Sequence, residues 1–229
     1  MQALNSFYQI IGINFKNPDL IQEALTHRSY LNENTAWSIP HNERLEYLGD
    51  AVLELAVSEF LFAKFATYPE GQLTVLRASL VNYQLLARVA NQIQLGEYLH
   101  MSRGEAKDTG RAREVILANA IEAVIGAIYL DQGYTVAQGF VERFVQPHLG
   151  EILKTRSYKD PKSELQEIIQ ERLRVTPTYN VLSEEGPAHQ RIFTVGVYFG
   201  NQLIAQGGGP SKQEAETEAA KNALQQNQR

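Results

Sequence analysis

Cysteine is absent from this chain of 229 residues. Disulfides and sites in which thiolates bind zinc or an iron–sulfur cluster are therefore excluded, and a chain without disulfides suits a reducing compartment. Histidine does not replace cysteine as a metal ligand, because the histidines are scattered without the spacing of a zinc site. The five histidines are His27, His41, His100, His148 and His189.

Long hydrophobic segments are missing as well. The longest apolar run, residues 123–130, is far shorter than the roughly 18 residues that a membrane-spanning helix needs. The first residues lack the basic and apolar regions of a signal peptide. We therefore expect a protein without membrane association that is located in the cytoplasm.

An excess of basic charge is missing too, since the formal net charge is −5. Proteins that bind nucleic acids usually display a basic face, so this balance taken alone argues against such a partner. Residues 1–156 hold 13 basic and 17 acidic side chains, and residues 157–229 hold 8 and 9. With 44% hydrophobic and 21% charged residues, the composition is that of a globular protein and excludes a disordered chain.

Residues 1–150 are predicted to be entirely helical. Apolar residues recur at near-helical spacing over residues 43–65, 72–94 and 111–130. Prolines fall between the periodic stretches, where residues that interrupt helices belong. They are Pro18, Pro40, Pro69 and Pro147.

A change of composition after Gly150 indicates a second domain. The following segment is polar and without periodicity, which predicts a linker over residues 151–159 and a second domain over residues 160–227. Asp160 and Pro161 are suited to start a helix, because Asp caps helix N-termini and Pro fits the first turn.

Strand patterns follow this helix. The alternation of apolar residues over 193–199 predicts a strand, and further strands are expected over 178–182 and from Leu203. Ser211 and Glu214 form a capping box that opens a last helix. The expected order is helix, three strands, helix, which makes a small α+β unit (α-β-β-β-α).

Three glycines, Gly207, Gly208 and Gly209, precede the last helix and are predicted to be a flexible connector. They resemble a phosphate cradle, but the Gly-Lys-Ser/Thr ending of a nucleotide-binding loop does not follow them. We therefore expect no nucleotide cofactor.

Three acidic residues share one face of the helix predicted at 43–65. At 100° per residue, Glu43, Glu46 and Asp50 fall within about 60° of one another. No lysine stands four residues beyond Glu46 or Asp50 to relieve the repulsion of these like charges. A solvated face is the plain interpretation, and a bound cation is the alternative that the apolar flanking residues favour.

A second pair of oxygen donors lies in the apolar segment 115–130. Asn119 and Glu122 are three residues apart and therefore share a face of the predicted helix. A carboxylate in so apolar a helix is costly unless it is paired or bound to metal, so Glu122 has either an arginine partner, such as Arg44 or Arg111, or a metal ion. Oxygen ligands without histidine or sulfur favour Mg²⁺ or Mn²⁺ over zinc.

The segment at 42–52, Asn-Glu-Arg-Leu-Glu-Tyr-Leu-Gly-Asp-Ala-Val, resembles the signature of the ribonuclease III family. Companion segments of the family occur in the same order at 24–30, 70–73, 110–111 and 122–127. The second domain is similar to the double-stranded-RNA-binding domain that follows the nuclease domain in bacterial members. The resemblance covers nearly the whole chain and implies an all-α nuclease domain with the ribonuclease III fold plus the small α+β domain.

The resemblance also implies which residues form the metal-binding and catalytic site. Mg²⁺, with Mn²⁺ as a substitute, would be held by Glu46, Asp50, Asn119 and Glu122, of which Asp50 and Glu122 are the expected catalytic residues. Glu43 and Glu70 are expected to support the ligands or to orient RNA, and Arg111 to contact phosphate. Asn119 stands where the family commonly has aspartate, and its neutral amide should lower the affinity for metal.

The expected function is an endoribonuclease that cleaves double-stranded RNA with a divalent metal, as a homodimer, and leaves staggered ends with 5′-phosphate and 3′-hydroxyl groups. Ribosomal and other RNA precursors are the expected substrates. The alternative is a non-catalytic double-stranded-RNA-binding protein that keeps the nuclease fold for dimerisation, with Asn119 as the mark of a decayed site. The joint presence of Glu46, Asp50 and Glu122 argues against this alternative.

In the second domain, the resemblance assigns RNA contacts to three regions, which are the first helix, the loop after the first strand and the start of the last helix. The residues are Lys162, Ser163, Gln166, Glu167, Pro187, His189, Ser211 and Lys212. Gln213 stands where a lysine is usual, and the domain is not basic overall. We therefore expect weak RNA binding whose dependence on salt is shallower than that of a basic relative.

Overall fold

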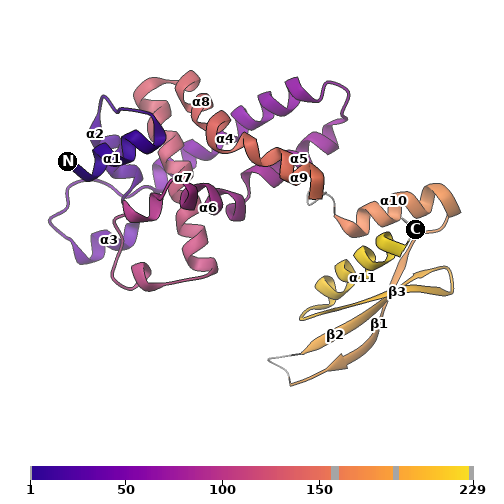
Figure 1. Ribbon diagram of the computed structural model, residues 1–229. Helices are drawn as coiled ribbons and strands as arrows, with labels where there is room; N and C mark the ends of the chain where they lie inside the picture. The colour runs from indigo at the N-terminus through magenta and orange to yellow at the C-terminus, as the bar shows by residue number, and fades with distance from the viewer. Residues whose placement is uncertain (1, 156–159, 188–190, 227–229) are drawn as a thin grey trace. The chain divides into compact units, whose positions relative to one another are not determined.

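The computed structural model describes residues 2–155, 160–187 and 191–226. The contacts divide the chain into two compact units, Met1–Tyr158 and Lys159–Arg229 (Figure 1). Each unit has a hydrophobic core of its own. Among the described helices, none is long and apolar enough to cross a membrane.

The first unit is helical in its described residues, which confirms the predicted class. The elements are α1 (Gln2–Ile11), α2 (Pro18–Ala24), α3 (Arg28–Glu33), α4 (Glu43–Lys64), α5 (Glu70–Val81), α6 (Tyr83–Gln92), the short 3₁₀ helices η1 (Leu95–Glu97) and η2 (Glu105–Lys107), α7 (Arg111–Gln132), α8 (Tyr134–Phe144), η3 (Gln146–His148) and α9 (Leu149–Thr155).

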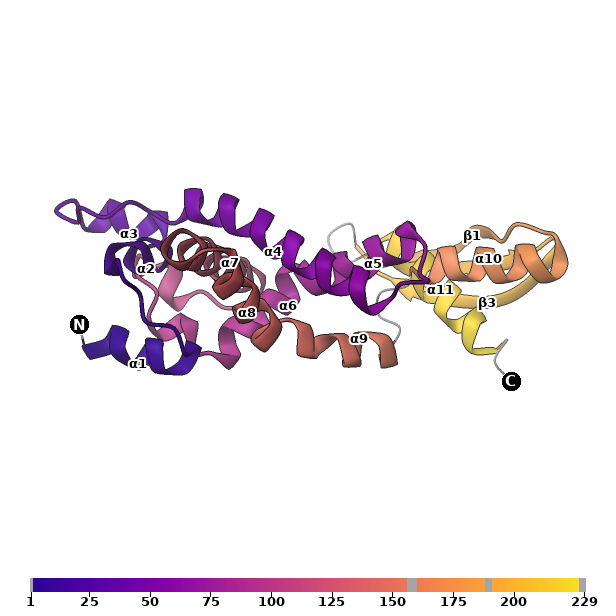
Figure 2. The ribbon, with the colours of Figure 1, turned by 90° about the horizontal axis from the view of Figure 1, so that it is seen from above.

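Helix α7 forms the centre of this unit and packs against α2, α4, α6 and α8. From Ile116 to Ile128 every residue is buried except Asn119 and Glu122, which are partly exposed. Figure 2 shows α4 running alongside α7, which is the most extensive contact between two helices of this unit. The two polar residues therefore interrupt an otherwise apolar core helix.

The continuous helix expected over residues 72–94 is wrong, because the structure ends α5 at Val81 and starts α6 at Tyr83. Asn82 lies between them with extended backbone angles (φ −73°, ψ 155°), and its side-chain oxygen accepts a hydrogen bond of 2.9 Å from the Leu85 amide. The Asn82 side chain thus caps the start of a new helix. This break does not change the spacing of the apolar residues, so the sequence pattern does not indicate it.

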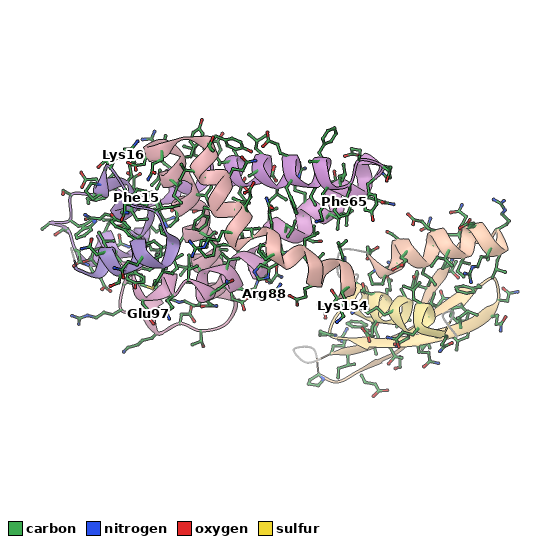
Figure 3. All side chains as sticks on the ribbon, turned by 45° about the horizontal axis from the view of Figure 1, so that its top comes forward. Phe15, Lys16, Phe65, Arg88, Glu97 and Lys154 are labelled. Atoms are coloured by element: carbon green, nitrogen blue, oxygen red, sulfur yellow. The ribbon has the colours of Figure 1, made fainter. Side chains whose placement is uncertain are left out.

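The linker predicted over residues 151–159 begins too early. Residues up to Thr155 belong to α9, where Leu149 and Ile152 are buried in the core. Arg88 of α6, labelled in Figure 3, forms an ion pair of 3.3 Å with Glu151 of α9. These contacts make the segment helical despite its polar composition, and residues 156–159 lie outside the described residues.

The second unit has the predicted order of helix, three strands, helix. Its elements are α10 (Pro161–Leu173), β1 (Thr178–Glu185), β2 (Ile192–Phe199), β3 (Gln202–Gly209) and α11 (Lys212–Gln226). The strands form an antiparallel sheet in the order β1-β2-β3, and α11 packs on β2, β3 and α10 (Figure 1). Both predicted caps are present, since Asp160 accepts from the Ser163 amide at 3.0 Å and Ser211 Oγ accepts from the Glu214 amide at 3.2 Å.

The predicted flexible connector at Gly207, Gly208 and Gly209 is wrong, because these glycines form the end of β3 and pair with residues 193–195 of β2. A Cβ on Gly207 would lie 2.6 Å from the Ala215 carbonyl oxygen and would overlap the backbone of α11. The glycines therefore allow the last helix to pack directly on the sheet backbone.

Candidate functional site

Two glycines bring α4 and α7 into backbone contact. A Cβ on Gly49 would lie 2.5 Å from the carbonyl carbon of Glu122 and 2.9 Å from the amide nitrogen of Gly126. A Cβ on Gly126 would overlap the carbonyl oxygen of Leu45. Real Cβ atoms do not approach other atoms this closely, so the helices can cross here only because both side chains are absent. The crossing places the first turns of α4 beside the polar positions of α7.

The Glu122 carboxyl group lies in a partly buried, acidic environment. Burial and, to a lesser extent, the negative charges of Asp50, Glu46 and Glu54 together raise its pKa to about 8. Among the ion pairs of the described residues, none includes Glu122. The structure therefore gives no support to an arginine partner for this carboxylate.

Neither arginine considered as that partner is engaged with Glu122. The guanidinium of Arg111, the first residue of α7, lies 5.7 Å from the centroid of the Tyr83 ring. Arg44 is exposed on α4 and acts electrostatically on Glu23. Glu122 thus remains an uncompensated acid in the described part of the chain.

Glu46 connects the two helices. Burial raises its pKa, and Glu43 and Asp50 add to the rise, whereas a hydrogen bond from the Asn119 side chain lowers it. The amide group of Asn119 on α7 therefore donates to a carboxylate on α4. An aspartate at position 119 could not donate in this way when ionised, so asparagine replaces a repulsive contact by an attractive one.

The supporting residues lie in two places. Glu43 is exposed at the start of α4, where it pairs with Arg28 at 3.3 Å and lies 3.8 Å from the His41 ring. Glu70 begins α5 and accepts a hydrogen bond of 2.9 Å from Thr74. The structure places Glu70 in a separate cavity of about 410 Å³ between α4 and α5 and does not bring it to Glu122 within one chain. The cavity is lined by Ser58, Glu59, Leu61, Phe62, Glu70, Leu73, Thr74 and Arg77.

The oxygen donors of this site fit a hard metal ion by their chemistry. In residues 2–155, 160–187 and 191–226, no three His, Cys, Asp or Glu side chains already enclose a point where a metal could sit. Glu46, Asp50 and Glu122 nevertheless act on one another electrostatically, and all three offer oxygen atoms. Like charges separate when no cation is between them, and a hard dication prefers such ligands. The chemistry of the donors therefore fits Mg²⁺ or Mn²⁺.

The raised pKa of Glu122 predicts how the stability of the chain without bound metal responds to pH. The folded chain binds this proton more tightly than the unfolded chain, whose carboxyl pKa is the ordinary 4.5. Stability in EDTA should consequently fall as the pH rises from about 4.5 to about 8. Thermal unfolding of Glu122→Gln in EDTA should show a higher Tm than wild type at pH 9, by several degrees, and nearly the same Tm at pH 4.5. A Tm difference that does not change with pH would contradict the environment described for Glu122.

In the second unit, three of the residues predicted to contact RNA, Lys162, Ser163 and Gln166 of α10, line one hollow together with Gln213 and Thr217 of α11. Its volume is about 400 Å³, and it is lined by Asp160, Lys162, Ser163, Gln166, Pro177, Tyr179, Gln213 and Thr217. Gln166 and Glu167 are exposed on α10. The start of the first helix and the start of the last helix are thus neighbours, as one continuous RNA-facing surface requires.

Several of the side chains predicted to contact RNA already have partners within the domain. Lys162 Nζ lies 2.5 Å from Glu216 Oε2 and 4.8 Å from the Tyr179 ring centroid. Ser163 donates both its amide and its hydroxyl hydrogen to Asp160, at 3.0 and 2.8 Å. These contacts hold the start of α10 against β1 and α11.

Of the remaining residues predicted to contact RNA, the structure describes Pro187, Ser211 and Lys212, and none of the three lines this hollow. Lys212 Nζ lies 3.2 Å from Glu184 Oε1, a partner that sequence reasoning missed because the two residues are joined only by the fold. Ser211 caps α11, and Pro187 is exposed after β1. His189 lies outside the described residues.

Both units resemble known protein families. Family models described as "Ribonuclease-III-like" and "Double-stranded RNA binding motif" match residues 17–149 and 161–227. The protein named Ribonuclease 3 of Carboxydothermus hydrogenoformans is 47% identical over 228 residues, which are 98% of this chain and 95% of that protein. Ribonuclease 3 of Pelotomaculum thermopropionicum is 47% identical over 214 residues, which are 93% and 89% of the two chains.

Solved structures match the helical unit. The nuclease domain of ribonuclease III from Campylobacter jejuni superposes with a TM-score of 0.58 at 40% identity, over 65% of this chain and 97% of that chain. The predicted resemblance is thereby confirmed, and it extends over both domains. The chain belongs to the ribonuclease III family and is an endoribonuclease that carries a double-stranded-RNA-binding domain after its nuclease domain.

Proposed function

We propose that this endoribonuclease hydrolyses phosphodiester bonds of double-stranded RNA with a divalent metal ion and leaves staggered ends with 5′-phosphate and 3′-hydroxyl groups. One observation carries the proposal. The Glu122 carboxylate lies partly buried beside Asp50 and Glu46, and no ion pair of the described residues compensates it. Such a group is costly in a helix that serves only for packing, and it suits a site that binds a dication.

Glu46, Asp50, Asn119 and Glu122 would hold Mg²⁺, for which Mn²⁺ could substitute. A bound dication of this kind supplies a more acidic water and stabilises a departing oxyanion. Glu122 and Asp50 would act as the catalytic residues, since they contribute uncompensated carboxylates from the two crossing helices. Asn119 positions Glu46 through its hydrogen bond, and Glu43 adds negative charge at the exposed edge of the site.

Arg111 is suited to contact phosphate. It is exposed, it begins α7, and the N-terminus of a helix favours a bound anion. The Tyr83 ring supports its guanidinium from one side, which leaves its donors available to a ligand. Glu70 has a supporting role in this proposal and would act from the cavity between α4 and α5.

We also propose that the enzyme acts as a homodimer. Large apolar side chains are exposed on α4 and α5, including Tyr47 at 83% and Phe62 at 75% exposure, together with Leu55 and Val75. Exposed apolar groups concentrated on neighbouring helices are typical of a surface that a partner covers. A solved structure of the Campylobacter jejuni nuclease domain is described as having a region involved in dimer formation. Two sites related by a two-fold axis would suit the nearly two-fold symmetry of a duplex.

The second domain would hold the duplex by its shape, through 2′-hydroxyl and phosphate groups, using the surface around Ser163, Gln166, Pro187 and Ser211. Precursors of ribosomal and other RNAs that contain duplex segments would be the substrates, and the cytoplasm would be the site of action. The non-catalytic alternative rests on Asn119, whose neutral amide weakens a metal site. Cleavage of a duplex by the purified chain decides between the two.

The test measures cleavage of a labelled RNA duplex across Mg²⁺ and Mn²⁺ concentrations and in EDTA. We expect cleavage with either ion and none in EDTA. The variant Asn119→Asp should reach half-maximal rate at an Mg²⁺ concentration about tenfold lower, because a carboxylate binds the dication more tightly than an amide.

The variant Asn91→Asp is the matched control, since it adds the same charge at an exposed position of α6 and should leave the metal requirement unchanged. Cleavage that persists in EDTA would refute the metal-dependent mechanism. An unchanged Mg²⁺ requirement in Asn119→Asp would remove Asn119 from the ligand set.

A further inference from the structure

We propose that Glu184 competes with RNA phosphates for Lys212 and Arg191, and thereby weakens the binding of double-stranded RNA by the second domain. This inference rests on the proposed RNA-binding surface and adds to it a residue that acts against binding. It also gives a structural cause for the weak RNA binding expected of this domain, which holds 8 basic and 9 acidic residues over 157–229.

The sheet aims the Glu184 side chain at the start of α11. Glu184 pairs across the strands with Phe193 of β2, so the two side chains lie on the same face of the sheet. Lys212 is the first residue of α11, and its Nζ lies 5.5 Å from the Phe193 ring centroid and 3.2 Å from Glu184 Oε1. The ammonium group is thus held between an aromatic ring and a carboxylate.

The same carboxylate engages a second cation. Arg191, which directly precedes β2, places its guanidinium nitrogen 3.5 Å from Glu184 Oε2. Lys212 belongs to the start of the last helix and Arg191 to the end of the β1–β2 loop, which are two of the three regions expected to face RNA. One glutamate therefore neutralises a cation in each of two RNA-facing regions.

These ion pairs contribute little to folding. The side chains of Lys212, Arg191 and Glu184 are 57%, 46% and 38% exposed, and ion pairs this exposed add little to the stability of the fold. A phosphate offers the same donors a negative charge and several acceptor oxygens, so RNA and Glu184 compete for them. Each phosphate contact must then displace a carboxylate before it contributes to affinity.

The pair between Lys162 and Glu216 does not compete in this way. Its side chains are 34% and 28% exposed, its atoms are 2.5 Å apart, and the Tyr179 ring lies against the lysine. This pair connects α10 to α11 and is part of the packing of the domain. Glu184, at the exposed ends of the strands, is the acid that can leave its partners without disturbing the fold.

The test is duplex RNA binding by the full-length chain in EDTA, measured by fluorescence anisotropy over a range of salt concentrations. Glu184→Gln should bind about three- to tenfold more tightly than wild type at about 0.1 M salt. The slope of log affinity against log salt should become steeper by about one to two, because up to two more phosphates are then neutralised. Glu185→Gln is the matched control, because it removes the same charge from the next residue of β1, which has no ion pair among the described residues.

A second comparison separates competition from a change of fold. In a chain that carries Lys212→Gln and Arg191→Gln, the further change Glu184→Gln should give no gain in affinity. Equal affinity of Glu184→Gln and wild type, an equal gain in Glu185→Gln, or a gain that persists without both cations would overturn the inference. Each of these results leaves the proposed function intact if the wild type binds the duplex, whereas no duplex binding by either protein would overturn both.

Discussion

The variant Glu122→Gln is expected to lose cleavage of duplex RNA by at least about a thousandfold, equivalent to about 4 kcal/mol of transition-state stabilisation. The reason is that glutamine removes a negative charge that no cationic side chain of the described residues compensates, and this charge is what a dication would use. Single-turnover cleavage in saturating Mg²⁺ measures the effect. Binding of the same duplex in EDTA should stay within about twofold of wild type, because the RNA-binding domain is untouched.

The control for Glu122→Gln is Glu54→Gln. Glu54 is exposed on α4, one turn beyond Asp50, and its charge also acts on Glu122, but it is not among the proposed ligands. This variant should keep cleavage within a few-fold of wild type. Normal turnover by Glu122→Gln, or a comparable loss in Glu54→Gln, would show that the chemistry does not depend on this particular carboxylate.

The variant Gly49→Ala is expected to destabilise the nuclease domain by more than about 3 kcal/mol, because the added methyl group would overlap the backbone of α7 at Glu122. The helices would have to separate, and Asp50 and Glu46 would move away from Glu122. Thermal denaturation should show a Tm lower by more than about 6 °C, and any folded protein should cleave poorly even in excess Mg²⁺.

Gly139→Ala provides the comparison for this change. Gly139 lies in the exposed face of α8, where a Cβ would meet no atom within 4 Å, so alanine should be neutral or slightly stabilising there. A Gly49→Ala enzyme with the stability and activity of Gly139→Ala would mean that close approach of α4 and α7 is not required for the site.

Much of the fold is predictable because it depends on neighbouring residues. The alternation over 193–199 predicted β2, and the caps at Asp160 and Ser211 predicted the starts of α10 and α11. Each of these signals joins residues only a few positions apart. Residue spacing also placed Glu46 and Asp50 on one face of α4 without reference to any other part of the chain.

The misplaced boundaries have a different origin. The Asn82 break does not change the apolar period, and residues 151–155 became helical because Ile152 reaches the core of the first unit. The glycines at 207–209 are predicted to be a connector because only their flexibility can be judged from the sequence. Their function in β3 depends on α11, whose backbone lies against them.

Sequence alone determined the two domains, their classes and the acidic residues that could bind a dication, because composition, periodicity and spacing are local properties. Tertiary structure alone decided that no arginine among the described residues pairs with Glu122, that Asn119 donates to Glu46, that Glu70 occupies a separate cavity within one chain and that Glu184 holds two cations. The physical reason is distance along the chain. Groups separated by many residues exert their charges on one another only after backbone packing, here at Gly49 and Gly126 and at the α11–sheet contact, has brought them together.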